Sequence, residues 1–167
     1  MFYTIADDLI FYQLISYKKK YSNFEIKLHN YFHVKSGGIY PDFIVVIRQF
    51  IFFFVKNEYY FASKHHLDSM RRGMKSKKII IIRTESVLIN LLFSLFPDVY
   101  IHDIAFEVDE TSNQREISIY FLTFKERGIA IGRGGEYIKC INELFKNFIR
   151  FNNKEKPIDI KCRNLFD

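Results

Sequence analysis

The sequence predicts an α+β protein: a short helix-strand piece, then a small β-barrel, then a compact α-β-β-α-α-β module. Three observations lead to this prediction. Apolar residues recur at helical spacing near the start of the chain and in its C-terminal half. Between residues 43 and 82, short runs of aromatic and β-branched residues are separated by small polar breaks, as strands are. A cluster of glycines also separates two helical segments near residue 132.

The composition is that of a globular, basic protein. The 167 residues are 49% apolar and 26% charged, with a net charge of +6, which argues against wholesale disorder and favours an anionic partner. The longest apolar run, residues 43–55, is interrupted by Arg48 and Gln49 and is shorter than the ~20 residues that a membrane crossing needs. We therefore expect no membrane association.

The amino-acid usage also indicates an origin. The chain is rich in Phe, Ile, Asn and Lys and poor in Ala, which is typical of an AT-rich genome such as that of an organelle. The N-terminus lacks the basic n-region of a signal peptide and the Arg/Ser-rich composition of a transit peptide. We expect an organelle-encoded protein of the plastid stroma, or otherwise a cytoplasmic protein of an AT-rich bacterium.

The N-terminal half is predicted to begin with a helix over about residues 5–21, which ends in Lys18, Lys19 and Lys20. Alternating residues predict a strand at 24–29, and glycines 37 and 38 with Pro41 then interrupt the chain. The remaining elements expected here are strands at 43–48, 50–55 and 59–62, a basic turn at 71–78 and a strand at 79–82.

The C-terminal half shows clearer periods. Thr84 is a predicted N-cap for a helix that Pro97 ends. The later elements, in chain order, are a hairpin of residues 104–108 and 117–121 around a polar loop, helices at 124–130 and from 136 to about 151, a stop at Pro157, and a strand at 158–162.

The chain offers little that predicts catalysis. Cys140 and Cys162 lie on apolar-periodic stretches and read as buried thiols. His65 and His66 with Asp68 lack a further ligand at suitable spacing for zinc, so we read them as surface or RNA-facing residues. We expect no enzymatic activity, no metal, no cofactor and no small-molecule substrate.

Four of the seven glycines fall between positions 128 and 135, in the run Gly-Ile-Ala-Ile-Gly-Arg-Gly-Gly. A dinucleotide-binding loop would follow a strand, and a Walker loop would need Gly-Lys-Ser/Thr. The run instead matches the I-G-x-x-G signature of the KH domain, in which a Gly-x-x-Gly loop between two helices grips single-stranded RNA. The element order resembles the type II arrangement of that domain. The alternative is a KH fold that has lost RNA binding and is kept for packing.

The KH resemblance assigns a binding role to the loop and its flanks. Gly132 and Gly135 would let phosphates approach backbone amides at the start of the following helix, and Arg133 would supply a charge. The candidate RNA-binding residues are Gly128, Ile129, Ile131, Gly132, Arg133, Gly134, Gly135, Ile138 and Lys139.

Beyond the loop, the chain resembles the bacterial transcription termination and antitermination factor NusA. The stretch from Ile79 to Thr84 and the helix ending at residues 96–99 are similar to that family's junction between its OB fold and first KH domain. Residues 15–27 are similar to a helix end and strand of its polymerase-binding domain. The barrel is shorter than the family's, and no second KH domain fits after residue 166.

The NusA resemblance implies three regions: a reduced polymerase-binding region at 1–41, a reduced OB-fold RNA-binding domain at 42–83, and a type II KH domain at 84–167. The implied partners are single-stranded nascent RNA and a multisubunit RNA polymerase. Lys18, Lys19 and Lys20 are candidate polymerase contacts. The basic residues Arg71, Arg72, Lys75, Lys77 and Lys78 are either a solvated loop or additional phosphate contacts.

Two questions stay open at this point. The protein could instead be a KH-containing small-subunit ribosomal protein or an RNA-maturation protein. The aromatic residues at 52–54 and 59–61 are either core or a base-stacking platform, and core is favoured because half of a strand's side chains must point inward.

Overall fold

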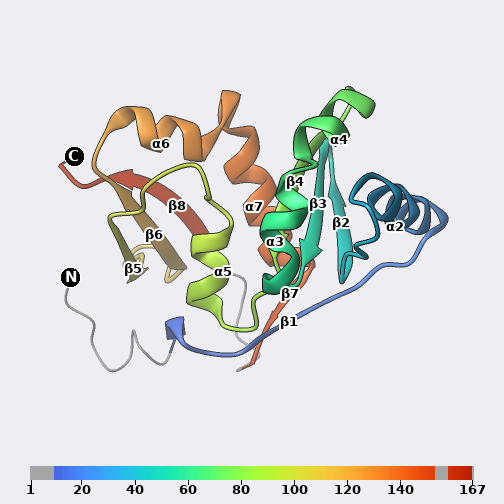
Figure 1. Ribbon diagram of the computed structural model, residues 1–167. Helices are drawn as coiled ribbons and strands as arrows, with labels where there is room; N and C mark the ends of the chain where they lie inside the picture. Colours follow the sequence, from blue (N-terminus) through green and yellow to red (C-terminus); the bar gives the residue numbers. More distant parts are fainter. Residues whose placement is uncertain (1–9, 153–157, 167) are drawn as a thin grey trace. The chain divides into compact units, whose positions relative to one another are not determined.

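The computed structural model describes residues 10–152 and 158–166 (Figure 1). The chain divides into two compact units: unit 1, made of residues 1–17 and 86–167, and unit 2, made of residues 18–85. Unit 2 contains α2 (Asn23–Lys35), β2 (Phe43–Ile47), β3 (Phe50–Val55), η1 (Asn57–Tyr59), α3 (Tyr60–Lys64), α4 (Leu67–Gly73) and β4 (Lys78–Arg83). Unit 1 contains β1 (Ile15–Tyr17), α5 (Leu88–Ser94), β5 (Asp103–Val108), β6 (Arg115–Phe121), α6 (Phe124–Ile131), η2 (Arg133–Gly135), α7 (Glu136–Asn147), β7 (Ile149–Phe151) and β8 (Asp159–Asn164).

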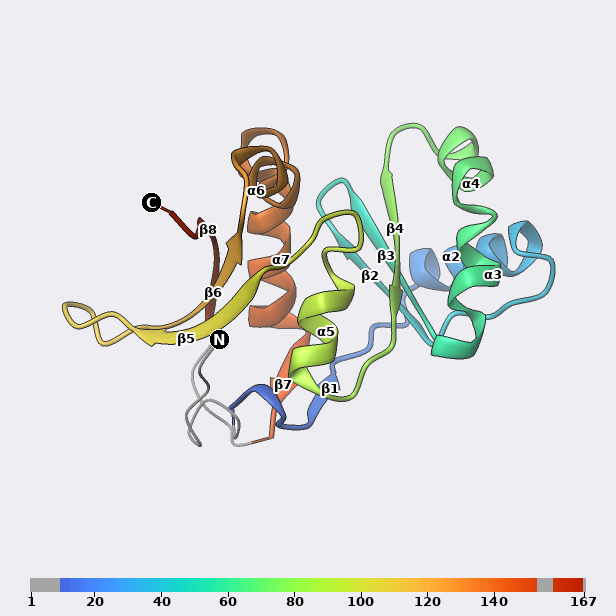
Figure 2. The ribbon, with the colours of Figure 1, turned by 60° about the vertical axis from the view of Figure 1, so that its left-hand side comes forward.

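Unit 2 is built on a three-stranded sheet of order β2-β3-β4. β2 and β3 form an antiparallel hairpin, and β4 lies parallel to β3 with Val55 opposite Arg83. A parallel pair needs a crossover, and α3 and α4 provide it. Figure 2 shows α2, α3 and α4 on one side of this sheet.

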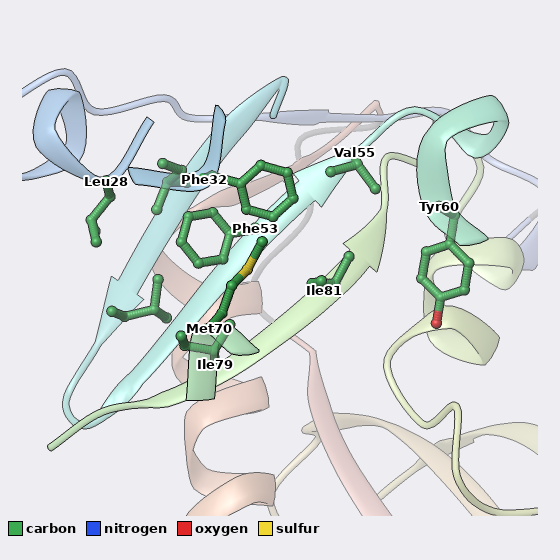
Figure 3. Packing of buried hydrophobic residues seen from close by; sticks show 10 residues of the cluster. Leu28, Phe32, Phe53, Val55, Tyr60, Met70, Ile79 and Ile81 are labelled. Atoms are coloured by element: carbon green, nitrogen blue, oxygen red, sulfur yellow. The ribbon is translucent and has the colours of Figure 1, made fainter. Parts of the chain in front are cut away.

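The helix-covered face of that sheet carries the core of unit 2 (Figure 3). Phe32 of α2 packs against Phe53 of β3 with ring centroids 4.7 Å apart and the ring planes tilted by 34°, and both rings are fully buried. Truncating such a buried ring to Ala costs about 3–5 kcal/mol. The cluster consists of Leu28, Phe32, Ile44, Ile51, Phe53, Val55, Tyr60, Met70, Ile79 and Ile81.

Unit 1 contains a second three-stranded sheet, of order β5-β6-β8. β5 and β6 are antiparallel, and β8 is parallel to β6 with Phe121 opposite Asn164. α6 and α7 form the crossover, and Figure 2 shows α5, α6 and α7 on one side of the sheet. β1 pairs with β7 in a separate two-stranded sheet of the same unit.

The two units share one topology. Apart from the 3-10 turns and the β1-β7 pair of unit 1, the described elements of each run α-β-β-α-α-β, with an antiparallel first pair and a parallel last strand at the edge. One side-chain contact is also equivalent: Arg71 of α4 donates to the carbonyl of Ile79, and Asn142 of α7 donates to that of Ile160, at matching positions of β4 and β8. The sequence showed no such internal repeat.

The prediction for the C-terminal half is largely confirmed in its elements. The hairpin, the short helix, the longer helix and the last strand are all present. Thr84 is not an N-cap, because its N–H extends the ladder of unit 2 by donating to Val55, and α5 starts after Val87. The longer helix ends at Asn147 rather than near residue 151, because β7 follows it. Pro157 lies outside the described residues.

The predicted OB-like barrel is wrong: the described residues of this region form an open three-stranded sheet covered by helices. Two predicted strands, at 24–29 and 59–62, are helical, and part of the predicted basic turn belongs to α4. The start of the helix predicted over residues 5–21 lies outside the described residues, and its C-terminal part contains β1 instead.

The observed units also divide the chain differently from the three predicted regions, because α2 packs with β2 and β3 in a single core. The α+β class itself is confirmed. No helix within residues 10–152 and 158–166 has both the length and the apolar character needed to span a membrane.

Candidate nucleic-acid interface

The glycine loop begins where α6 ends, at Gly132. Its φ of 81° and ψ of 170° lie in a region that only glycine occupies readily. A Cβ at this position would lie 2.9 Å from the Cβ of Tyr137, in the first turn of α7. A glycine is therefore required at position 132 for two reasons: the backbone angles there and the close approach of the next helix.

The rest of the loop is a single 3-10 turn. Gly134 and Gly135 have φ values of 62° and 72°, which are left-handed and cost other residues energy. Arg133 and Gly134 are exposed, and nothing lies within 4 Å of a Cβ added at Gly134. The turn leads directly into α7, a 12-residue helix whose N-terminal dipole favours an anion.

Beside the loop, unit 1 has an open cavity of 560 Å³ that is lined by residues of α6, α7 and all three strands of the β5-β6-β8 sheet, with more residues from the edge strand β8 than from any other element. Helices α6 and α7 supply Arg127, Ile131 and Ile138 to its wall. The sheet supplies Glu107, Tyr120, Lys161, Cys162, Arg163 and Asn164. The wall therefore combines the apolar side chains of Ile131 and Ile138 with cations and hydrogen-bonding groups from α6 and the strands, a mixture that can accommodate a nucleotide.

Two side chains fasten the outer edge of β8 to the helices. Asn142 donates to the carbonyl of Ile160 at 3.0 Å and accepts its N–H at 2.8 Å. Arg127 donates from Nε to the carbonyl of Cys162 at 3.0 Å. These bonds satisfy the backbone of an edge strand and hold the cavity wall in place.

The cations of β8 are partly neutralised. Glu116 is buried and pairs with Lys161 at 2.6 Å and with Arg163 at 3.3 Å. Glu107 accepts hydrogen bonds from Ser118 at 3.1 Å and Tyr120 at 2.7 Å. Burial and the neighbouring Glu107 raise the pKa of Tyr120, which keeps its hydroxyl protonated as the donor to Glu107.

The wall also contains two buried neutral groups, the thiol of Cys162 and the amide of Asn164. Burial raises the pKa of the Cys162 thiol to about 12, against a smaller lowering by Arg127, so the thiol is protonated and a poor nucleophile at pH 7. Asn164 is buried, and neither its amide nitrogen nor its amide oxygen has a partner among the described residues. An unpaired buried amide costs free energy in the fold, and a ligand that bonded to it would recover that cost.

The predicted loop residues lie at different distances from the cavity. Ile131 and Ile138 line it, whereas Ile129 is about half exposed and does not. Gly128 belongs to the last turns of α6, where its carbonyl accepts the N–H of Gly132. Lys139 is exposed on α7, with its Cε 3.8 Å from where a Cβ of Gly135 would lie.

The other predicted contacts are scattered over unit 2. Arg71 and Arg72 are on α4. Lys77 donates to the carbonyl of Arg48 at 3.1 Å, and Lys78 starts β4 with its ammonium 5.5 Å from the ring of Phe50. The remaining predicted contacts are all exposed: Lys75 is in a turn, and the lysines at 18–20 lie outside regular structure. The ammonium of Lys19 lies over the ring of Phe43.

The site predicted from the sequence does not include the polar wall, which consists of Glu107, Tyr120, Arg127, Lys161, Arg163 and Asn164. One signal was available: Ile160 and Cys162 mark the inward positions of the last strand, and continuing that alternation places Asn164 inward as well. Within residues 10–152 and 158–166, no group of three or more His, Cys, Asp or Glu is placed to hold a metal ion.

Comparison with known proteins shows a similar fold in one solved structure and indicates no function. No family model and no curated protein match the chain. One similar solved structure is "Crystal structure of APE1850", with a TM-score of 0.57 at 21% identity, over 84% of this chain and 100% of that chain. Since neither unit alone makes up that share of this chain, the likeness includes residues of both units.

Proposed function

We propose that this protein binds single-stranded RNA through unit 1, in the manner of a type II KH domain. The observation that carries the proposal is the Gly132–Gly135 loop, which joins α6 to α7 and lies beside a polar and apolar cavity at the edge of β8. Phosphates would contact the loop and the N-terminus of α7, and bases would enter the cavity.

The same topology in unit 2 extends the proposal to a tandem of two KH-like units, of which only unit 1 has the glycine loop. In unit 2 the link between α3 and α4 is His65-His66. In this proposal, a second KH-like unit takes the place of the OB fold that the NusA resemblance implies. The proposed RNA-binding role of that part of the chain is unchanged.

The decisive experiment is the double variant R133D/G134D. It places two carboxylates where phosphates would bind, and the open space around Gly134 lets the chain tolerate the new side chain. For a single clamp with about three phosphate contacts, we expect micromolar affinity for single-stranded RNA and a salt slope of about −2. The double variant should lose most of this affinity, as measured by fluorescence anisotropy with a labelled RNA.

The matched control is K146D/N147D, which makes the same change of charge at exposed positions in the last turn of α7. We expect this variant to keep most of the affinity. A folded R133D/G134D protein that binds RNA as tightly as the wild type would exclude the loop as the clamp. Circular dichroism and thermal melting would establish that both variants are folded.

We further propose that the bound RNA is a nascent transcript and that the protein associates with a multisubunit RNA polymerase. The support is the NusA-like sequence at Ile79–Thr84, which forms most of β4 ahead of α5. Residues 15–27 give no such support, because they form β1 and the start of α2, whereas the resemblance implies a helix end followed by a strand. A role on the small ribosomal subunit or in RNA maturation is the competing function.

A further inference from the structure

The last residue of the edge strand has an equivalent place in the two units. Arg83 ends β4 opposite Val55, and Asn164 ends β8 opposite Phe121. In both residues a buried side-chain atom has no hydrogen-bond partner among the described residues: Nε in Arg83, and both amide atoms in Asn164. In unit 1 this position lines the cavity, which makes its counterpart in unit 2 a candidate second site.

Arg83 lies against two aromatic rings of α3. Its guanidinium carbon is 4.3 Å from the ring centroid of Tyr60 and 5.1 Å from that of Phe61. The two rings meet edge to face, with centroids 5.5 Å apart. Tyr60 is 6% exposed and belongs to the core of unit 2 (Figure 3), whereas Phe61 is 68% exposed. The core thus fixes one ring and the cation, and the second ring is open to solvent.

The charge of the chain is concentrated in the unit that carries this cluster. Residues 18–85 contain 14 Lys and Arg against 5 Asp and Glu, a formal charge of +9. The residues of unit 1 contain 11 Lys and Arg against 14 Asp and Glu, a formal charge of −3. The unit with the glycine loop is therefore acidic overall, and attraction of a polyanion comes from unit 2.

We propose that Arg83, Tyr60 and Phe61 form a second nucleotide-binding site, which needs no glycine loop. A base stacks on the exposed face of Phe61, and the guanidinium of Arg83, held over the rings, donates to an adjacent phosphate. This proposal rests on the proposed function, because it assigns the same single-stranded RNA a second contact. An acidic peptide would use the charge of unit 2 and would gain less from a flat exposed ring.

The chain contains no tryptophan, which allows a direct test. In the full-length F61W variant the single indole reports on this site alone, and a stacked base should quench its fluorescence as single-stranded RNA is added. F24W is the control, since Phe24 is an exposed aromatic residue on α2 of the same unit. We expect strong quenching in F61W and little in F24W. No quenching of F61W at RNA concentrations that saturate binding would overturn the site, as would equal quenching by poly-glutamate.

Affinities complete the test. We expect F61A and R83Q each to weaken RNA binding about fivefold or more, the lower end of what one base stack contributes. F24A and K27Q, which remove an exposed ring and an exposed charge from α2, should change it less than twofold. Unchanged affinity in folded F61A and R83Q would contradict the proposal.

Comparing these variants with R133D/G134D separates the two sites. If the loop variant removes binding while F61A and R83Q do not, the proposed function stands and the second site fails. If F61W is quenched and F61A weakens binding while the loop variant has no effect, the second site stands and the loop is excluded.

Discussion

At the scale of single residues, the glycines of the 128–135 run have different physical roles. Gly132 combines a positive φ with a neighbour that leaves no space for a Cβ. Gly134 needs its positive φ but is open to solvent. Gly128 is an ordinary helical position with nothing within 4 Å of an added Cβ. The four glycines of the motif therefore differ in what they require. Gly132 is required by both its backbone angles and its neighbour, Gly134 and Gly135 are required by their positive φ alone, and Gly128 is replaceable.

This difference predicts opposite effects of the same substitution. Gly132→Ala should destabilise unit 1 by about 2–3 kcal/mol, because it combines backbone strain with a clash against Tyr137. Gly128→Ala should stabilise it by about 0.5–1 kcal/mol, because Ala has less conformational entropy to lose in a helix. Urea unfolding of the two variants measures both values. Equal stabilities would show that the loop does not have the described conformation.

The conformation of the loop was predictable from the sequence, because crowded glycines indicate a tight turn, and the structure has such a turn between α6 and α7. Its role in RNA binding stays a prediction. Ile131 and Ile138 were also expected beside the RNA, and both line the cavity. The polar wall was not predictable, because Glu107, Tyr120 and Arg163 come from three strands whose register the sequence does not encode locally.

At the scale of elements, the errors arose where a local pattern disagreed with packing. Residues 24–29 alternate between apolar and polar side chains, which favours a strand, yet Phe24 and Ile26 are exposed. The buried residues Glu25, Leu28 and Phe32 are spaced by three and four, which is the period of a helix. The aromatic run at α3 favoured a strand because aromatic residues have a high strand propensity. Its buried residues, Tyr60 and Ser63, are instead three positions apart, which is the spacing of a helix.

Two asparagines test how α7 and β8 form the cavity. Asn142 makes three hydrogen bonds, one to the carbonyl of Ile138 and two to the backbone of Ile160, while Asn164 makes none among the described residues. Asn142→Leu should cost about 2 kcal/mol or more, because it leaves the backbone of Ile160 without partners. Asn164→Leu should be neutral or stabilising, because it removes two unpaired polar atoms from a buried position.

The proposed function adds a second readout for this pair. We expect Asn164→Leu to bind RNA about threefold more weakly despite its stability, because the cavity wall loses an amide donor and acceptor. Thermal melting and anisotropy on both variants are the measurements. A clear loss of stability in Asn164→Leu would show that its amide is satisfied within the fold, and would remove the argument that it serves a ligand.

At the scale of the whole molecule, two units with one topology carry opposite net charges. This repeat is not visible in the sequence, because the units share element order and strand pairing but no motif. Unit 1 has Gly-Arg-Gly-Gly between its crossover helices, and unit 2 has His-His. Topology is determined by which surfaces are buried together, and many sequences satisfy the same pattern. The charge division then fits a protein in which one unit attracts RNA and the other holds it.

The last prediction concerns the partner that places this RNA binding in the cell. Residues 1–41 cannot be tested by deletion, because Leu28 and Phe32 of α2 belong to the core of unit 2 and their loss would unfold it. Charge reversal of the three exposed lysines is the appropriate change: K18E/K19E/K20E against the control K27E/K56E/K146E, which alters the same charge at other exposed positions.

We expect the tagged wild-type chain, purified from its own host at moderate salt after ribonuclease treatment, to retain the large polymerase subunits. The 18–20 variant should lose them and the control should keep them, because only a specific docking surface distinguishes two variants of equal net charge. Mass spectrometry of the eluates measures this. Small-subunit ribosomal proteins in stoichiometric amount, without polymerase, would overturn the transcriptional role while leaving RNA binding by unit 1 intact.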